Sequence, residues 1–136
     1  MSKGNTTEND TLDAILRAVD PAWRSGASRY IALHTADPGE AGTAVTSESA
    51  YGSYARQTVT AATGFTAAAG GSSSNTALIQ FPVCSGGSET ITHVSIVTTT
   101  SGAGQILYSG ALNASRSVSS GIQPQFSIGA LVITED

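Results

Sequence analysis

The stretch from Tyr30 to Thr43, YIALHTADPGEAGT, holds the densest group of chemically competent side chains in the sequence. His34 is followed at short spacing by two carboxylates, Asp37 and Glu40. An imidazole beside two carboxylates can bind a metal ion or act as an acid–base pair. The same residues also fit a β-strand that ends in a turn, so the surrounding elements must decide between these interpretations.

The Asp-Pro-Gly sequence at positions 37–39 is typical of a turn, because Pro presets its own φ and Gly tolerates a positive one. If Ile31 and Leu33 point into a core, His34 points to the opposite face of the strand. There we expect a partly exposed polar residue or a subunit contact. A metal site needs three or four converging ligands. The only other imidazole, His93, lies far along the chain and could join His34 only across a sandwich, so we expect no metal.

No other catalytic pattern is present in the sequence. It contains no GxSxG nucleophile elbow and no GxxxxGK[ST] phosphate loop, since its only lysine is Lys3. A Ser–His pair would arise by chance among so many serines, and only its geometry could identify it as functional. Asp37 and Glu40 would suit glycoside hydrolysis only in a cleft lined for a sugar. We therefore expect a protein without enzymatic activity and without a cofactor.

The composition limits the classes of function further. The chain has 136 residues, a net charge of −4 and only 12% charged residues, about half of the usual ~25%. Its cations are scattered, so we expect no nucleic-acid binding. The single cysteine, Cys84, excludes internal disulfides and lies in an apolar run, which predicts a buried thiol. No apolar run is long enough to cross a membrane, and the N-terminus resembles no export signal, so we expect a protein made without a signal peptide that binds no membrane.

The residue pattern predicts a single domain. Residues 1–10 are polar and are typical of a flexible N-terminal arm. From Arg29 onward, seven or eight short runs rich in Thr and β-branched residues alternate with Gly, Ser, Asn and Pro clusters, which predicts an all-β sandwich or barrel over residues 11–136. One helix is predicted over about residues 11–24, where apolar side chains recur at i, i+3, i+4, i+7 and i+11: Leu12, Ile15, Leu16, Val19 and Trp23.

Five stretches, in order, resemble a group of small structural proteins of tailed bacteriophages. They are YIALHTADPGEAGT at 30–43, SESAYGSYAR at 47–56, TITHVSIVTTTSGAGQILYSGAL at 90–112, SRSVSSGI at 115–122 and FSIGALVITED at 126–136. Members of this group are often labelled tail fibre proteins, and others are capsid decoration, or cement, proteins. The resemblance implies a jelly-roll-like antiparallel β-sandwich that forms trimers, and it brings no catalytic motif.

Two functions fit these observations. The first is a decoration protein on the outer surface of the virion head, which binds the major capsid protein and copies of itself and stabilises the assembled shell by mass action. The second is a tail or fibre module that binds a host-surface receptor. Tyr51 and Tyr54 are then the candidate receptor contacts, although they could equally pack on the core. The sequence has no internal repeat of the kind that builds a long shaft, which favours a compact domain on the head.

The N-terminal arm and helix are the expected contact elements. A polar arm joined to a short amphipathic helix with the only Trp can wrap a neighbouring surface. The alternative is that the helix closes one end of its own sandwich. The candidate capsid or inter-subunit contacts are Asn5, Thr6, Thr7, Leu12, Ile15, Trp23 and Arg24.

Two arginines lie within strand-like runs of this charge-poor chain, Arg56 and Arg116. They could form ion pairs with Glu48 or Glu89 across a trimer seam. The preferred interpretation is that both side chains lie on a solvated strand face, where ion pairs contribute little to stability.

Overall fold

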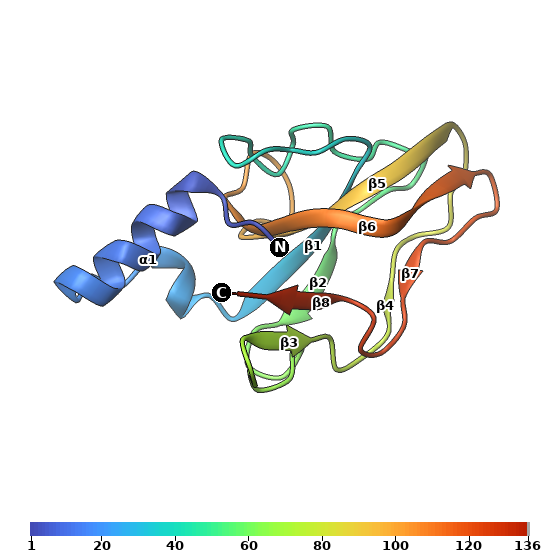
Figure 1. Ribbon diagram of the computed structural model, residues 1–136. Helices are drawn as coiled ribbons and strands as arrows, with labels where there is room; N and C mark the ends of the chain where they lie inside the picture. Colours follow the sequence, from blue (N-terminus) through green and yellow to red (C-terminus); the bar gives the residue numbers. More distant parts are fainter. Residues whose placement is uncertain (136) are drawn as a thin grey trace.

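The computed structural model describes residues 1–135. A helix, α1 (Asn5–Arg17), and a 3-10 turn, η1 (Ala22–Ser25), precede the strands. Eight strands follow within the described residues (Figure 1): β1 (Ser28–His34), β2 (Gln57–Thr60), β3 (Ser72–Ser74), β4 (Ile79–Gln80), β5 (Ser88–Val97), β6 (Ile106–Ser119), β7 (Gln125–Phe126) and β8 (Val132–Thr134). All of their pairings are antiparallel. The predicted all-β fold with one short N-terminal helix is confirmed.

The strands form a sandwich with unequal layers. One layer is a four-stranded sheet in the order β2-β1-β5-β6, whereas the other consists of two short ribbons, β3–β8 and β4–β7. β5 and β6 are joined through residues 98–105, the stretch TTTSGAGQ, and pair as an antiparallel hairpin. Gly102 supplies the positive φ, 73°, that this turn requires.

The core fills the space between the two layers. Its members come from both, which explains why neither layer could be stable alone. The Cys84 thiol is buried there, as predicted. The main buried apolar side chains are Ile31, Leu33, Ile79, Phe81, Ile91, Val94, Ile96, Leu131 and Ile133.

The helix begins earlier than the sequence suggested. It starts at Asn5 rather than near Thr11 and ends at Arg17, so the boundary predicted between a flexible arm and the helix is wrong. The physical reason is that the preceding residues are held by the body. Ser2 exchanges backbone hydrogen bonds with Ser109 at 2.8 Å, and the Asn5 N–H donates to Glu40 O at 2.9 Å. No helix within residues 1–135 has the length and apolar character needed to cross a membrane.

Phe81 is the side chain with which the core can be tested. Its ring stacks on Tyr54 at 6.2 Å and meets Phe126 edge-on at 6.4 Å. We expect Phe81→Ala to lower the free energy of unfolding by about 3–5 kcal/mol, because it leaves a cavity that the strands cannot close. Urea unfolding followed by Trp23 fluorescence measures the loss. The control Ile128→Ala removes a side chain that is 70% exposed and should cost no more than about 0.5 kcal/mol; equal losses in both variants would contradict the expected packing.

Candidate functional site

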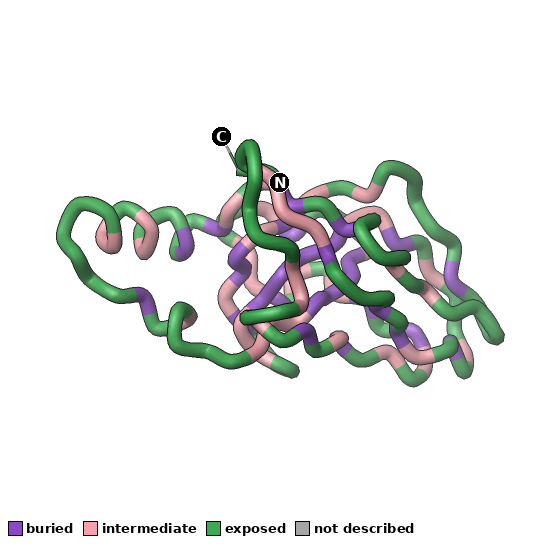
Figure 2. The backbone as a smooth tube through the Cα atoms, turned by 90° about the horizontal axis from the view of Figure 1, so that it is seen from below, coloured by how far each residue is buried: buried purple, intermediate pink, exposed green. Residues whose placement is uncertain are grey.

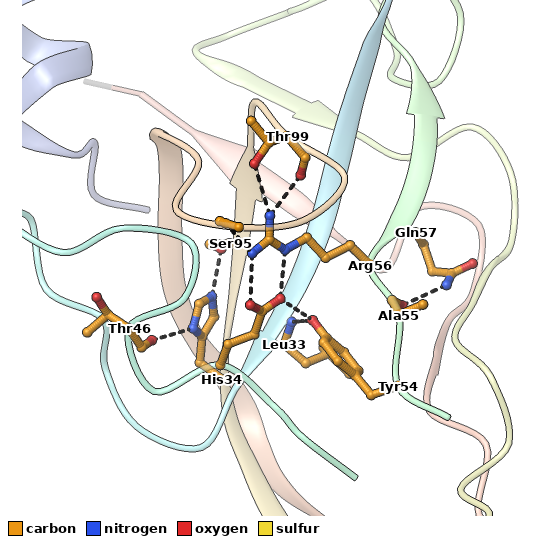
Figure 3. A network of polar contacts seen from close by, with 11 residues as sticks. Leu33, His34, Thr46, Tyr54, Ala55, Arg56, Gln57, Ser95 and Thr99 are labelled. Carbon is orange, nitrogen blue, oxygen red and sulfur yellow. Dashed lines mark hydrogen bonds and ion pairs between the residues drawn. The ribbon is translucent and has the colours of Figure 1, made fainter. Parts of the chain in front are cut away.

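His34 lies in a buried polar network rather than on a surface (Figure 3). Its Nδ1–H donates to Thr46 O at 2.9 Å, and its Nε2 lies 2.7 Å from Ser95 Oγ. The prediction of a partly exposed His34 is wrong, since the residue is fully buried. The cause is the segment after β1, which folds back over the strand: Thr35 N–H donates to Ser47 O, and His34 forms a β-bridge with Glu48.

His34 and Ser95 have the distance of a catalytic pair but lack access to a substrate. A carbonyl accepts the Nδ1 proton, so Nε2 accepts from the Ser95 hydroxyl. A base in a Ser–His hydrolase is normally oriented by a carboxylate, whereas here the orienting group is a backbone carbonyl. Both residues are fully buried. The pair therefore fixes β1 against β5 and is closed to solvent.

The other residues of the opening stretch have structural contacts. Gly39 N–H donates to Asp37 Oδ1 at 2.9 Å, which confirms the predicted turn. Glu40 accepts from Ser2 Oγ at 2.6 Å. His93 is the register partner of His34 across β1 and β5, so the two imidazoles do converge. Within residues 1–135, however, no group of three or more His, Cys, Asp or Glu side chains could hold a metal ion.

Arg56 and Glu48 form the strongest polar contact of the network (Figure 3). Arg56 Nε and Nη2 donate to the two Glu48 oxygens at 2.7 and 2.8 Å, and its remaining N–H groups bind Thr99 and Gly102 O. The hydrogen bond to Glu48 raises the pKa of Arg56. The pair lies within one chain, so the trimer-seam pairing suggested for Arg56 is wrong. Arg116 is exposed and has no ion-pair partner among the described residues.

Tyr51 belongs to the core, and Tyr54 is partly buried and packs against it. Their rings meet edge-on at 5.4 Å, and Tyr51 is 4% exposed. Tyr51 Oη donates to Pro82 O at 2.8 Å, while Tyr54 Oη donates to Glu48 and accepts from the Leu33 N–H. Burial raises the pKa of Tyr51 to about 12 and also raises that of Tyr54. The receptor contact suggested for these two residues is therefore wrong, because neither ring lies free on the surface.

The helix α1 projects from the sandwich instead of closing it (Figure 1), and the tube of Figure 2 shows most of it exposed. Its apolar stripe, which we define as Leu12, Ile15, Leu16 and Val19, is 55%, 73%, 76% and 46% exposed. Val19 follows the last helical residue, Arg17. The alternative in which the helix closes its own sandwich is wrong, because only its first two turns touch the body.

The contacts at the base of α1 are specific. Thr7 Oγ1 donates to Ile106 O at 2.6 Å, and Gln105 Nε2 donates to both Thr7 Oγ1 and Asp10 Oδ2 at 2.9 Å. Trp23 Nε1 also donates to Asp10 Oδ2 at 2.9 Å, which ties η1 back to α1. Thr7 is thus an internal residue and not a surface contact as predicted.

Of the other predicted contact residues, Asn5, Thr6 and Arg24 are exposed, and Arg24 forms an ion pair with Asp20. Trp23 is partly buried. The structure therefore brings Leu12 and Ile15 together on an open surface and uses Thr7 and Trp23 to hold that surface in place. The buried network of His34, Glu48 and Arg56 was not predicted. The one signal for it was a matched Glu and Arg in a chain with few charges.

The burial of His34 predicts a pH dependence of stability. Burial is the main cause that lowers the pKa of His34 below the ordinary 6.5, while the Thr46 hydrogen bond and the Glu48 charge oppose the shift in part. At pH values between the lowered pKa of folded His34 and 6.5, the unfolded chain binds more protons than the folded one. The contribution of neutral His34 to the free energy of unfolding is therefore fully present above pH 6.5 and is lost as the pH falls. Urea unfolding between about pH 8 and 5 should show a steeper loss for the wild type than for His34→Gln. Identical pH profiles would contradict the assignment.

The Arg56–Glu48 pair predicts a large loss of stability when one of its two partners is removed. We expect Arg56→Met to lower the free energy of unfolding by about 3–5 kcal/mol, because it leaves the Glu48 carboxylate without its partner in a buried site. Adding Glu48→Gln should recover part of that loss, since the double variant buries no unpaired charge. Arg116→Met is the matched control and should change stability by no more than about 0.5 kcal/mol. Additive losses of the two single variants would show that the pair is not coupled.

Comparison with known proteins places this arrangement in a family. A comparison with curated proteins finds no match. The family described as Podophage GP4 fiber I protein gp80 matches residues 2–134, nearly the whole chain, projecting helix included. The predicted resemblance to phage structural proteins is thereby confirmed. The family match does not by itself distinguish a fibre component from a capsid decoration protein. The chain belongs to the family of Podophage GP4 fiber I protein gp80, a family of phage structural proteins.

Proposed function

We propose that this protein is a structural component of a phage fibre, which works by joining proteins of the virion to one another. The observation that carries the proposal is the apolar stripe on the projecting helix α1. A contiguous apolar surface rimmed by polar residues marks a protein–protein contact site on a domain that is otherwise well packed. The family match supplies the setting, because its description names a fibre protein.

The position of this component within the fibre is proposed to be at a junction. A chain of 136 residues without internal repeats cannot form a long shaft by itself. Binding of a host receptor through Tyr51 and Tyr54 is not part of the proposal, since these two side chains pack in and against the core. The proposal includes no enzymatic step, because the Ser95–His34 pair is closed to solvent.

A second function, capsid decoration, is favoured by the compact shape of the sandwich. The partner would then be the major capsid protein, and α1 would lie on the outer surface of the head. Such a protein stabilises the shell because it binds only the assembled lattice. Both functions place the chain in the virion, and they differ in the protein that α1 contacts.

Cryo-electron microscopy of intact particles tests the location. We expect density for the sandwich, with its projecting helix, where the fibres join the particle. Regular density over the head surface would contradict the fibre proposal and establish the decoration function. If mass spectrometry of purified particles failed to detect the chain, both functions would be overturned.

A further inference from the structure

A groove lies beside α1 on the same end of the molecule as the apolar stripe. It has a volume of about 400 Å³ and is lined by partly buried aromatic rings above buried aliphatic side chains. Aromatic residues and Arg are enriched where proteins bind one another. We define this aromatic groove by Trp23, Phe65, Ile96, Leu107, Tyr108 and Ile133.

The stripe cannot fill the groove of its own chain. Thr7 and Thr11 form the side of α1 that lines the groove. With 3.6 residues per turn, the stripe lies about a third of a turn around the helix from that side. Stripe and groove are therefore neighbours on one surface, and both stay open in the single chain. The accessible surface reflects this: it is 7109 Å², against roughly 6,600 Å² for a compact monomer of this mass.

The charges around the two surfaces are complementary. α1 carries Glu8, Asp10 and Asp13 against a single Arg17. Glu8 precedes Leu12 by four residues, so it lies on the face of the stripe, and its carboxylate has no partner among the described residues. At the edge of the groove, the Arg29 guanidinium donates to the carbonyls of Gly26 and Ser28, at 3.0 and 2.9 Å, and forms no ion pair within the described residues, whereas Lys3 and Glu135 of the same groove pair with each other.

We propose that the apolar stripe of one copy packs into the aromatic groove of a second copy, with Glu8 of the first copy directed toward Arg29 of the second. The occupant is a second copy because the two halves of one interface, apolar and charged, lie side by side on the same chain. Such a pair of surfaces closes into a symmetric oligomer when each copy offers its stripe to the groove of the other. The inference rests on the proposed function only in treating the stripe as a contact surface, and it names the partner of that surface.

Sedimentation velocity of the purified chain across a concentration series tests the proposal. The wild type should sediment as a multiple of 13.7 kDa. Leu16→Glu should sediment as a monomer, because it places a charge in the apolar contact while removing no contact within the chain. Ile128→Glu is the matched control: Ile128 is 70% exposed but lies between β7 and β8, away from α1, and this variant should remain oligomeric. Circular dichroism establishes that each variant is folded.

A charge exchange tests the groove independently of the stripe. Glu8→Arg and Arg29→Glu should each weaken association about tenfold, and the double variant should restore it. If Leu16→Glu dissociates the oligomer but the double variant restores nothing, the assignment of the groove is overturned. A wild-type chain that is monomeric at every concentration overturns the whole inference. The proposed function would survive that result if electron microscopy still places the chain in the virion, with α1 on another protein.

Discussion

The buried ion pair between Arg56 and Glu48 is the contact on which one end of the sandwich depends. It joins the strand-entry loop that carries Arg56 to the nearby return over β1 that carries Glu48, and it ties both to the distant hairpin turn that carries Thr99 and Gly102. All of the Arg56 donors are satisfied, which a buried guanidinium requires if its desolvation is to be offset.

The same end of the molecule also positions the projecting helix. The hairpin turn that Arg56 holds continues directly into Gln105, whose side chain binds Thr7 and Asp10 of α1. Asp10 in turn accepts the Trp23 N–H, which fixes the segment returning from the helix. A continuous chain of polar contacts therefore runs from the core ion pair to the base of α1. These contacts hold the base of α1 against the body.

The sequence predicted those features that depend on local chemistry. The turn at residues 37–39 and the buried Cys84 follow from the residues present at those positions. The buried His34 could not be predicted in this way, because alternation in β1 says which face a side chain takes but not that a distant loop covers that face. Tyr51 and Tyr54 have the composition of a surface loop, yet Glu48 accepts the hydroxyl of Tyr54 and the Pro82 carbonyl accepts that of Tyr51, so both rings turn inward.

The prediction of where the helix begins was wrong for a related reason. Residues 5–10 are polar, and polarity alone is typical of a flexible arm, whereas hydrogen bonds from Ser2 and Asn5 to distant residues fix the chain just before this segment. Once those bonds hold the first turn, the costly nucleation of the helix is already complete. The apolar residues that made the helix recognisable in the sequence are the ones that the body leaves uncovered.

This arrangement has an energetic consequence for binding. A helix of 13 residues is marginal in water when it stands alone, and ordering a free segment at the moment of binding would reduce the affinity of the contact. Here the first two turns are ordered by the body in advance, so the ordering cost that remains is confined to the last turn, with Leu16, and to Val19 beyond the helix end. Preorganisation of this kind lowers the cost of association without adding any contact to the interface. In the proposed contact, the buried charges of the core would thus raise the affinity of the exposed stripe although they touch no partner themselves.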